Sequence, residues 1–149
     1  MLIRELSGNE IENAAELAWT VFKTFEAPDY GEQGITEFFK CIHDSQFLSQ
    51  LKFYGAFDGD DIVGTIATRS SGNHISLFFV NEQYQRQGIG KALFSRICKD
   101  NFSGKITVHS SPFAIPVYHQ LGFTDIDTEQ VTNGLRYTPM ECVIHNGKG

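Results

Sequence analysis

The sequence contains little cysteine, and the few cysteines present form no pattern that would staple a fold. Cys41, Cys98 and Cys142 are odd in number and far apart among 149 residues. They argue against a disulfide framework and favour a reducing, cytoplasmic location. Neither they nor the five histidines show the spacing of metal ligands, so we expect no metal site.

Long apolar runs and an excess of basic residues are also missing. No stretch approaches the length of a membrane span, and the first residues, MLIRELSGNE, lack the features of a signal peptide. The 12 basic residues stand against 18 acidic ones, which gives a net charge of −6. A nucleic-acid-binding protein is normally basic, so we expect neither a membrane nor a nucleic acid as partner. Negative charge suits a cationic ligand such as an amine.

Apolar residues, in contrast, are plentiful enough for one sizeable core. Hydrophobic residues make up 41% of the chain and 13 of them are phenylalanines. We see no repeat, linker or low-complexity tract, and we therefore expect a single domain over residues 1–149. The last residues, HNGKG, read as a frayed tail.

The most informative stretch runs from residue 74 to residue 90, HISLFFVNEQYQRQGIG. Ile75, Leu77 and Phe79 alternate with residues that are also largely apolar, which predicts an interior strand covered on both faces. The polar segment after it leads into a glycine-containing loop, and an amphipathic helix follows with Leu93 and Ile97 on its buried side. The free backbone N–H groups and positive dipole end of such a helix are a seat for a phosphate group.

Two well-known phosphate loops do not fit this stretch. In a Walker A loop the first glycine would stand at Gln85, and Ser or Thr would stand at Ala92. In a dinucleotide fingerprint that starts at Gly88, Leu93 occupies the position of the third glycine. A nucleotide-binding protein of either type is therefore nearly excluded.

The remaining elements follow from periodicity and turn signals. Ser7 to Glu10 forms an S-x-x-E capping box, and Pro28 stops the helix that it opens. Asp58-Gly59-Asp60 reads as a hairpin turn. The expected strands are 2–6, 53–57, 62–68, 74–80, 106–108, 123–126 and 135–144, with a helix from residue 113 or 114 to Gly122.

The pattern Q-x-x-G-x-G at Gln85 to Gly90 resembles the signature loop of the GNAT N-acetyltransferase superfamily. The stretch SPFAIPVYHQLGF, residues 111–123, is similar to that family's second motif, in which a Tyr follows a short helix start and precedes Gly-Phe. The element order β-α-α-β-β-β-α-β-α-β-β matches as well, and Asn133-Gly134 with Pro139-Met140 looks like small single-domain bacterial members. The resemblance implies an α/β (α+β) fold: a mixed, mostly antiparallel twisted sheet of about six or seven strands flanked by about four helices.

The resemblance also implies acetyl-CoA as cofactor, with its pyrophosphate on the loop and its pantetheine arm along the preceding strand. The Phe78 amide is the best candidate for an oxyanion donor. The cofactor-binding residues implied are Phe78, Phe79, Val80, Gln85, Arg86, Gln87, Gly88, Ile89, Gly90, Lys91, Ser111, Ala114 and Tyr118.

For catalysis, the resemblance assigns Tyr118 as the acid that protonates the leaving thiolate, because a phenol stays protonated at neutral pH. A gapless count back from the loop places His74 at the position of the family's base, although many members use a water chain instead. His109 is a further candidate for contact with the acceptor.

The loop between the first two helices, in this family, shapes the acceptor pocket. Glu26, Asp29 and Tyr30 lie in it, and we expect them to contact the substrate. The implied activity is acetyl transfer to a primary amine of a small molecule or peptide. The alternative is a non-catalytic acyl-CoA sensor or interaction domain, since the cofactor loop alone does not separate the two. A homodimer is the assembly that such small enzymes commonly form.

Overall fold

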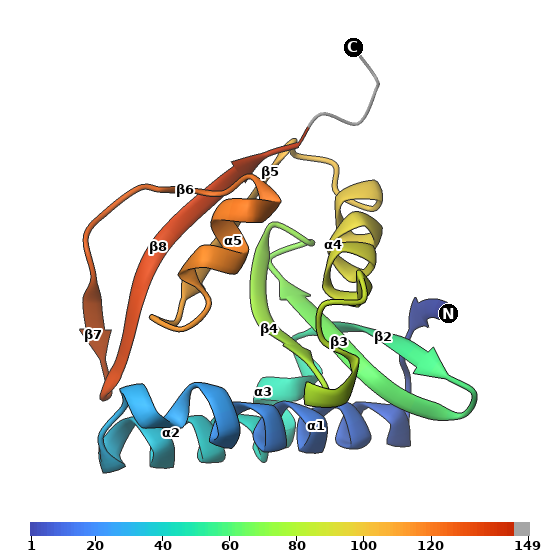
Figure 1. The fold of residues 1–149 in the computed structure, drawn as a ribbon, viewed down its shortest axis with the longest axis horizontal. Helices are drawn as coiled ribbons and strands as arrows, with labels where there is room; N and C mark the ends of the chain where they lie inside the picture. The colour runs from blue at the N-terminus through green and yellow to red at the C-terminus, as the bar shows by residue number, and fades with distance from the viewer. Residues whose placement is uncertain (145–149) are drawn as a thin grey trace.

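The computed structural model describes residues 1–144, and it builds them around one open, twisted sheet (Figure 1). Within that range the sheet has eight strands in the order β1-β2-β3-β4-β5-β8-β6, with β7 paired to β8, and only β4 and β5 are parallel. The strands are β1 (Leu2–Glu5), β2 (Lys52–Asp58), β3 (Asp61–Arg69), β4 (His74–Val80), β5 (Lys105–Ser110), β6 (Thr124–Asp125), β7 (Gln130–Thr132) and β8 (Leu135–Val143).

Helices cover both faces of this sheet, and two apolar clusters form the core. One cluster joins the sheet to α4 and α5, and the other joins it to α1, α2 and α3. The helices are α1 (Asn9–Phe25), α2 (Glu32–Ile42), α3 (Ser45–Ser49), α4 (Ile89–Lys99) and α5 (Ile115–Leu121), with 3₁₀ turns η1 (Ala27–Asp29) and η2 (Glu82–Tyr84). The fold class expected from the sequence is confirmed, with one or two more strands than expected and α3 as an additional short helix within residues 1–144.

Local signals explain where several elements begin and end. Ser7 N–H donates to the Glu10 carboxylate over 3.1 Å, which is one half of the predicted capping box, and α1 begins at Asn9. Gly122 ends α5 in the left-handed conformation, as its position before Phe123 predicted. Gly64 allows α4 to approach β3, because a Cβ at Gly64 would lie 3.0 Å from Ile89. The predicted frayed tail, 145–149, lies outside the described residues.

A bulge in β4 changes the side to which its first residues point. β3 pairs Ala67 with Leu77 but Thr68 with Ile75, so Ser76 has no opposite residue. As a result Ile75 packs in the cluster under α4, whereas Leu77 packs in the cluster under α1. The simple alternation expected from the sequence is therefore wrong at this point, and His74 lies on the opposite face from the one it implies.

β4 and β5 separate soon after they meet. They pair only at His74 with Thr107 and at Ile75 with Val108. Beyond these positions β4 curves toward η2 and α4, while β5 leads to α5, as Figure 1 shows. The separation leaves one edge of β4 open in the middle of the sheet, where a ligand can lie between the two halves.

The β7–β8 hairpin, a strand pair not expected from the sequence, lies against α2 at the far end of the sheet. The backbones of Gly34 and Gly134 touch so closely that a Cβ on Gly34 would lie 2.4 Å from the carbonyl oxygen of Gly134. Nearby, the Tyr30 hydroxyl donates to the Arg136 carbonyl over 3.1 Å. These contacts hold the hairpin against α2.

Candidate active site

The first part of the site is the loop between β4 and α4. Arg86 and Gly88 both have positive φ, 64° and 83°, and Gly88 is the N-cap of α4. Ala92 N–H donates to Gly88 O and closes the first turn of α4, so the N–H groups of the residues before Ala92 point out of the helix without an intrahelical acceptor. Non-glycine residues rarely adopt this conformation, and such strain concentrates at ligand-binding loops. The loop is therefore shaped as an anion seat.

The open edge of β4 is the second part. Asn81 N–H bonds to Val63 of β3, and the Gln85 side chain donates to Val80 O over 3.0 Å. In an antiparallel pair the N–H and C=O of one residue point to the same side and alternate along the strand. The N–H groups of Val80 and Phe78 therefore face away from β3, into the space that β5 leaves open. This supports the assignment of Phe78 as a backbone donor.

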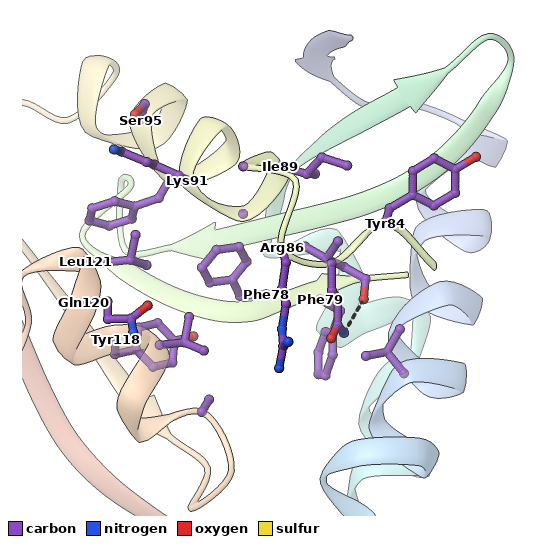
Figure 2. Close-up of a pocket in the computed structure, with 18 of the residues that line it drawn as sticks. Phe78, Phe79, Tyr84, Arg86, Ile89, Lys91, Ser95, Tyr118, Gln120 and Leu121 are labelled. Carbon is purple, nitrogen blue, oxygen red and sulfur yellow. Dashed lines mark hydrogen bonds between the residues drawn. The ribbon is translucent and has the colours of Figure 1, made fainter. Parts of the chain in front are cut away.

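The loop and the open edge border one long cleft of about 1310 Å³. Figure 2 shows it between α4, with Lys91 and Ser95, and α5, with Tyr118, Gln120 and Leu121, while Phe78 of β4 lies between them. Its volume exceeds the usual range for small-ligand pockets, about 300–1,000 Å³, and suits a cofactor with a long arm. Arg86 and Lys91 supply positive charge at the loop end.

Tyr118 stands where α5 meets the cleft. Its side chain is buried, its ring contacts Phe123 edge-on with centroids 5.2 Å apart, and the centroids of its ring and the Phe78 ring are 6.0 Å apart. Burial raises the pKa of the phenol above its ordinary value, and the charge of Glu26 acts in the same direction. The phenol therefore keeps its proton at neutral pH.

A second, smaller cavity of about 290 Å³ lies on the other side of Tyr118. Aromatic rings of α1 and α2 form much of one wall, and residues of the β7–β8 hairpin form another. The Ser76 hydroxyl, placed there by the bulge, is buried and has no hydrogen-bond partner within residues 1–144. A buried hydroxyl without a partner is costly, and it is a polar contact that a ligand in this cavity can satisfy.

Glu26, at the end of α1, lines both cavities. Burial raises the pKa of its carboxyl group to about 7, a hydrogen bond from Ser111 acts against that rise, and the charge of Asp29 adds to it. The position of Glu26 directly after a helix end and before Pro28 indicates the loop that shapes the acceptor pocket. The sequence gives no sign that this residue also borders the cofactor cleft.

The structure brings most of the predicted cofactor residues together. The cleft is lined by Phe78, Phe79, Val80, Gln85, Arg86, Gly88, Ile89, Gly90, Lys91, Ala114 and Tyr118. Gln87 is not part of this lining in the described chain, and its side chain donates back to Gln83 O. Ser111 lines the smaller cavity instead of the cleft. The sequence gave no indication of further cleft residues on α4 and α5, namely Phe94, Ser95, Cys98, Lys99, Val117, Gln120 and Leu121.

The predicted base and acceptor residues are less tightly grouped. Among residues 1–144, Tyr30 and His109 line the smaller cavity, while Asp29 and His74 line neither cavity. His74 is bonded to the Thr107 hydroxyl over 2.8 Å, and its ring meets His109 edge-on at 4.8 Å. Burial lowers the pKa of His74 to about 4, with added effects of Arg69 and His109. The bulge at Ser76 turns the His74 side chain to the face opposite the one that the sequence alternation implied.

Comparison with known proteins agrees with this geometry. Residues 26–144 match the family model described as an acetyltransferase (GNAT) domain, and the chain belongs to that family. No curated protein matches significantly. In the part of the chain that the structure describes, no helix could span a membrane and no cluster of side chains could hold a metal ion.

Solved structures with the same fold are numerous but distant in sequence. A GCN5-related N-acetyltransferase from Rhodopseudomonas palustris has a TM-score of 0.82 at 18% identity, over 95% of this chain and 94% of that one. The PaiA N-acetyltransferase from Thermoplasma acidophilum, in complex with coenzyme A, has a TM-score of 0.76 at 21% identity, over 95% and 98%. An aminoglycoside 6′-N-acetyltransferase complexed with coenzyme A has a TM-score of 0.64 at 15% identity, over 97% and 98%. At these identities the likeness concerns the fold.

Proposed function

We propose that this protein is an acetyl-CoA-dependent N-acetyltransferase that acts on a primary amine of a small molecule or peptide. The observation that carries the proposal is the meeting of two cavities at Tyr118. One cavity is a long cleft with an anion seat at its end, and the other is a compact pocket with aromatic walls. The proposed location is the cytoplasm, where the three free cysteines would stay reduced.

The residues of the cleft fit coenzyme A. The N–H groups of the loop around Gly88, with Arg86 and Lys91 beside them, would hold the pyrophosphate. The N–H groups of Phe78 and Val80 would pair with the amides of the pantetheine arm, as an added strand would. When bound, acetyl-CoA supplies a thioester, whose acyl carbon is open to attack by an amine.

The chain's own groups then act at two atoms of the thioester, the acyl oxygen and the sulfur. The Phe78 N–H donates toward the acyl oxygen as negative charge develops there, which lowers the barrier. The Tyr118 hydroxyl donates toward the departing sulfur. Because burial raises the pKa of this phenol, it gives up its proton less readily than a free phenol does. Part of its contribution is therefore a hydrogen bond that stabilises the thiolate, in addition to proton transfer.

The smaller cavity sets limits on the acceptor. Its volume of about 290 Å³ is at the lower end for small-ligand sites, and the β7–β8 hairpin closes one side. A compact amine fits inside, and a peptide would present only its terminal amine and first side chain there.

A thiol-release assay tests the function directly. Acetyl-CoA is incubated with the protein and a panel of primary amines, polyamines, amino acids and short peptides, and free coenzyme A is measured with a thiol reagent. We expect release that depends on one class of amine and a product heavier by one acetyl group. Binding of acetyl-CoA without turnover of any acceptor would contradict the proposal and favour the acyl-CoA sensor.

A further inference from the structure

We propose that Glu26 is the catalytic base, the group that takes a proton from the acceptor amine as the amine attacks the acyl carbon. The inference rests on the function proposed above and names the residue that completes its chemistry. His74, the base that the family resemblance implied, lines neither cavity among the described residues, which leaves this role open to another group.

The position of Glu26 between the two cavities carries the argument. The amine enters from the smaller cavity and the thioester lies in the cleft, so they can meet only at the wall that both share. Within residues 1–144 five residues line both: Glu26, Phe78, Phe79, Ala114 and Tyr118. Of these, only Glu26 and Tyr118 carry a titratable group, and Tyr118 holds its proton. The carboxylate is then the one proton acceptor that this wall offers.

Within residues 1–144, no cation is among the causes of the shifted Glu26 pKa. The titratable groups that act on Glu26 or line a cavity with it are Asp29, Tyr30, Glu37, Tyr84, Arg86, Lys91, Cys98, Lys99, His109, Tyr118, Arg136 and Tyr137. Arg136 is engaged by Glu129 over 3.0 Å, and the pKa of His109 is lowered by burial, which keeps that ring neutral. Burial therefore dominates and raises the pKa of Glu26 to about 7. A carboxylate with such a pKa is a stronger base than an ordinary one and is still ionised just above neutrality.

The proton and electron balance is complete with the groups named. A carbon–nitrogen bond forms between the amine and the acyl carbon, and the carbon–sulfur bond breaks with its electron pair on sulfur. The nitrogen loses one proton to Glu26, and Tyr118 gives one to the sulfur. Glu26 then releases its proton to solvent, and Tyr118 regains one, so both groups return to their starting states.

The first test is the pH profile of kcat/KM with the amine identified by the thiol-release panel. The wild type should gain activity as the pH rises through about 7, because Glu26 must lose its proton before it can act. Glu26→Gln should lower kcat/KM by ~10²–10⁴-fold and abolish this acidic limb. Glu12→Gln, which neutralises an exposed carboxylate on the same helix, should match the wild type.

Two neighbours supply readouts that a merely structural glutamate would not give. Asp29→Asn removes a charge that raises the pKa of Glu26, so the acidic limb should move to lower pH. Ser111→Ala removes a hydrogen bond that lowers this pKa, so the limb should move to higher pH. The two opposite shifts of the acidic limb should appear together.

A second measurement does not depend on turnover. In protein with ¹³C-labelled glutamate side chains, one carboxyl resonance should titrate near pH 7 and vanish in Glu26→Gln. A Glu26 resonance that titrates near the ordinary value of ~4.3 would overturn the proposal. So would full activity and an unchanged acidic limb in Glu26→Gln. A wild type that turns over no amine would overturn the proposed function itself, which is a different outcome.

Discussion

At the scale of single residues, Tyr118 makes the sharpest prediction. Tyr118→Phe keeps the ring and its contacts with Phe78 and Phe123 but removes the proton. We expect kcat to fall by ~10²–10⁴-fold, while the dissociation constant of acetyl-CoA, measured by calorimetry, hardly changes. Tyr54→Phe is the matched control, since this tyrosine is also buried and its hydroxyl donates to Asp100, the C-cap of α4, over 2.7 Å.

The control should lose about 1 kcal/mol of stability with its hydrogen bond and retain full activity. Full turnover in Tyr118→Phe would show that Tyr118 serves only in packing and that solvent protonates the thiolate.

His74 predicts a pH effect on stability instead of on catalysis. Its pKa in the folded protein is lowered from 6.5 to about 4, so the unfolded chain binds a proton more readily than the folded one. Stability from this group is complete above pH 6.5 and is lost as the pH falls toward 4. Urea unfolding at pH 7 and pH 5 should show a smaller loss for His74→Gln than for the wild type. An equal loss in both, or a rate limb near neutrality that vanishes in His74→Gln, would contradict this assignment.

At the scale of elements, the β4–α4 loop can be tested with a pair of glycines. Gly88 and Gly59 both have positive φ, and a Cβ at either position meets no atom within 4 Å. A valine at each therefore introduces similar backbone strain, of order 1–3 kcal/mol, and its Cβ lies in open space. Only Gly88 lies at the anion seat, so Gly88→Val should abolish acetyl-CoA binding in calorimetry and Gly59→Val should not. Equal affinities of the two variants for acetyl-CoA would show that this loop does not bind the cofactor.

The contact of α2 with the β7–β8 hairpin predicts a separate effect on the acceptor. Gly34→Ala favours the helix by about 0.5–1 kcal/mol, but its Cβ would lie 2.4 Å from Gly134 O and must displace the hairpin. We expect a higher KM for the amine, an unchanged dissociation constant for acetyl-CoA and a lower melting temperature. A stability gain with normal KM would show that the hairpin yields without opening the smaller cavity.

At the scale of the whole molecule, the sequence predicted what depends on local pattern and missed what depends on packing between distant segments. The loop at Gly88 and the helix end at Gly122 were predictable because their conformations need particular residues. The bulge at Ser76 was not, since apolar residues on both faces of β4 hide a change of register. Glu26 lines both cavities only because α1, α5 and β4 come together in the fold. Residue contacts of this kind leave no periodic signal along the chain.

The homodimer stays a prediction, which sedimentation equilibrium at micromolar concentrations tests.

The separation of β4 from β5 makes a final prediction about ligand and stability. The sheet halves pair directly at two positions, so a ligand that lies along the open edge of β4 should join them. Acetyl-CoA at 100 times its dissociation constant should add about 2.7 kcal/mol, or roughly 5–10 °C in melting temperature for a chain of this size. Hydrogen exchange should slow at the Phe78 and Val80 amides, which face the opening. The Phe79 amide, which faces β3, should be protected with or without ligand. Gly88→Val should show neither change, and a thermal shift without slower exchange at Phe78 and Val80 would place the ligand elsewhere.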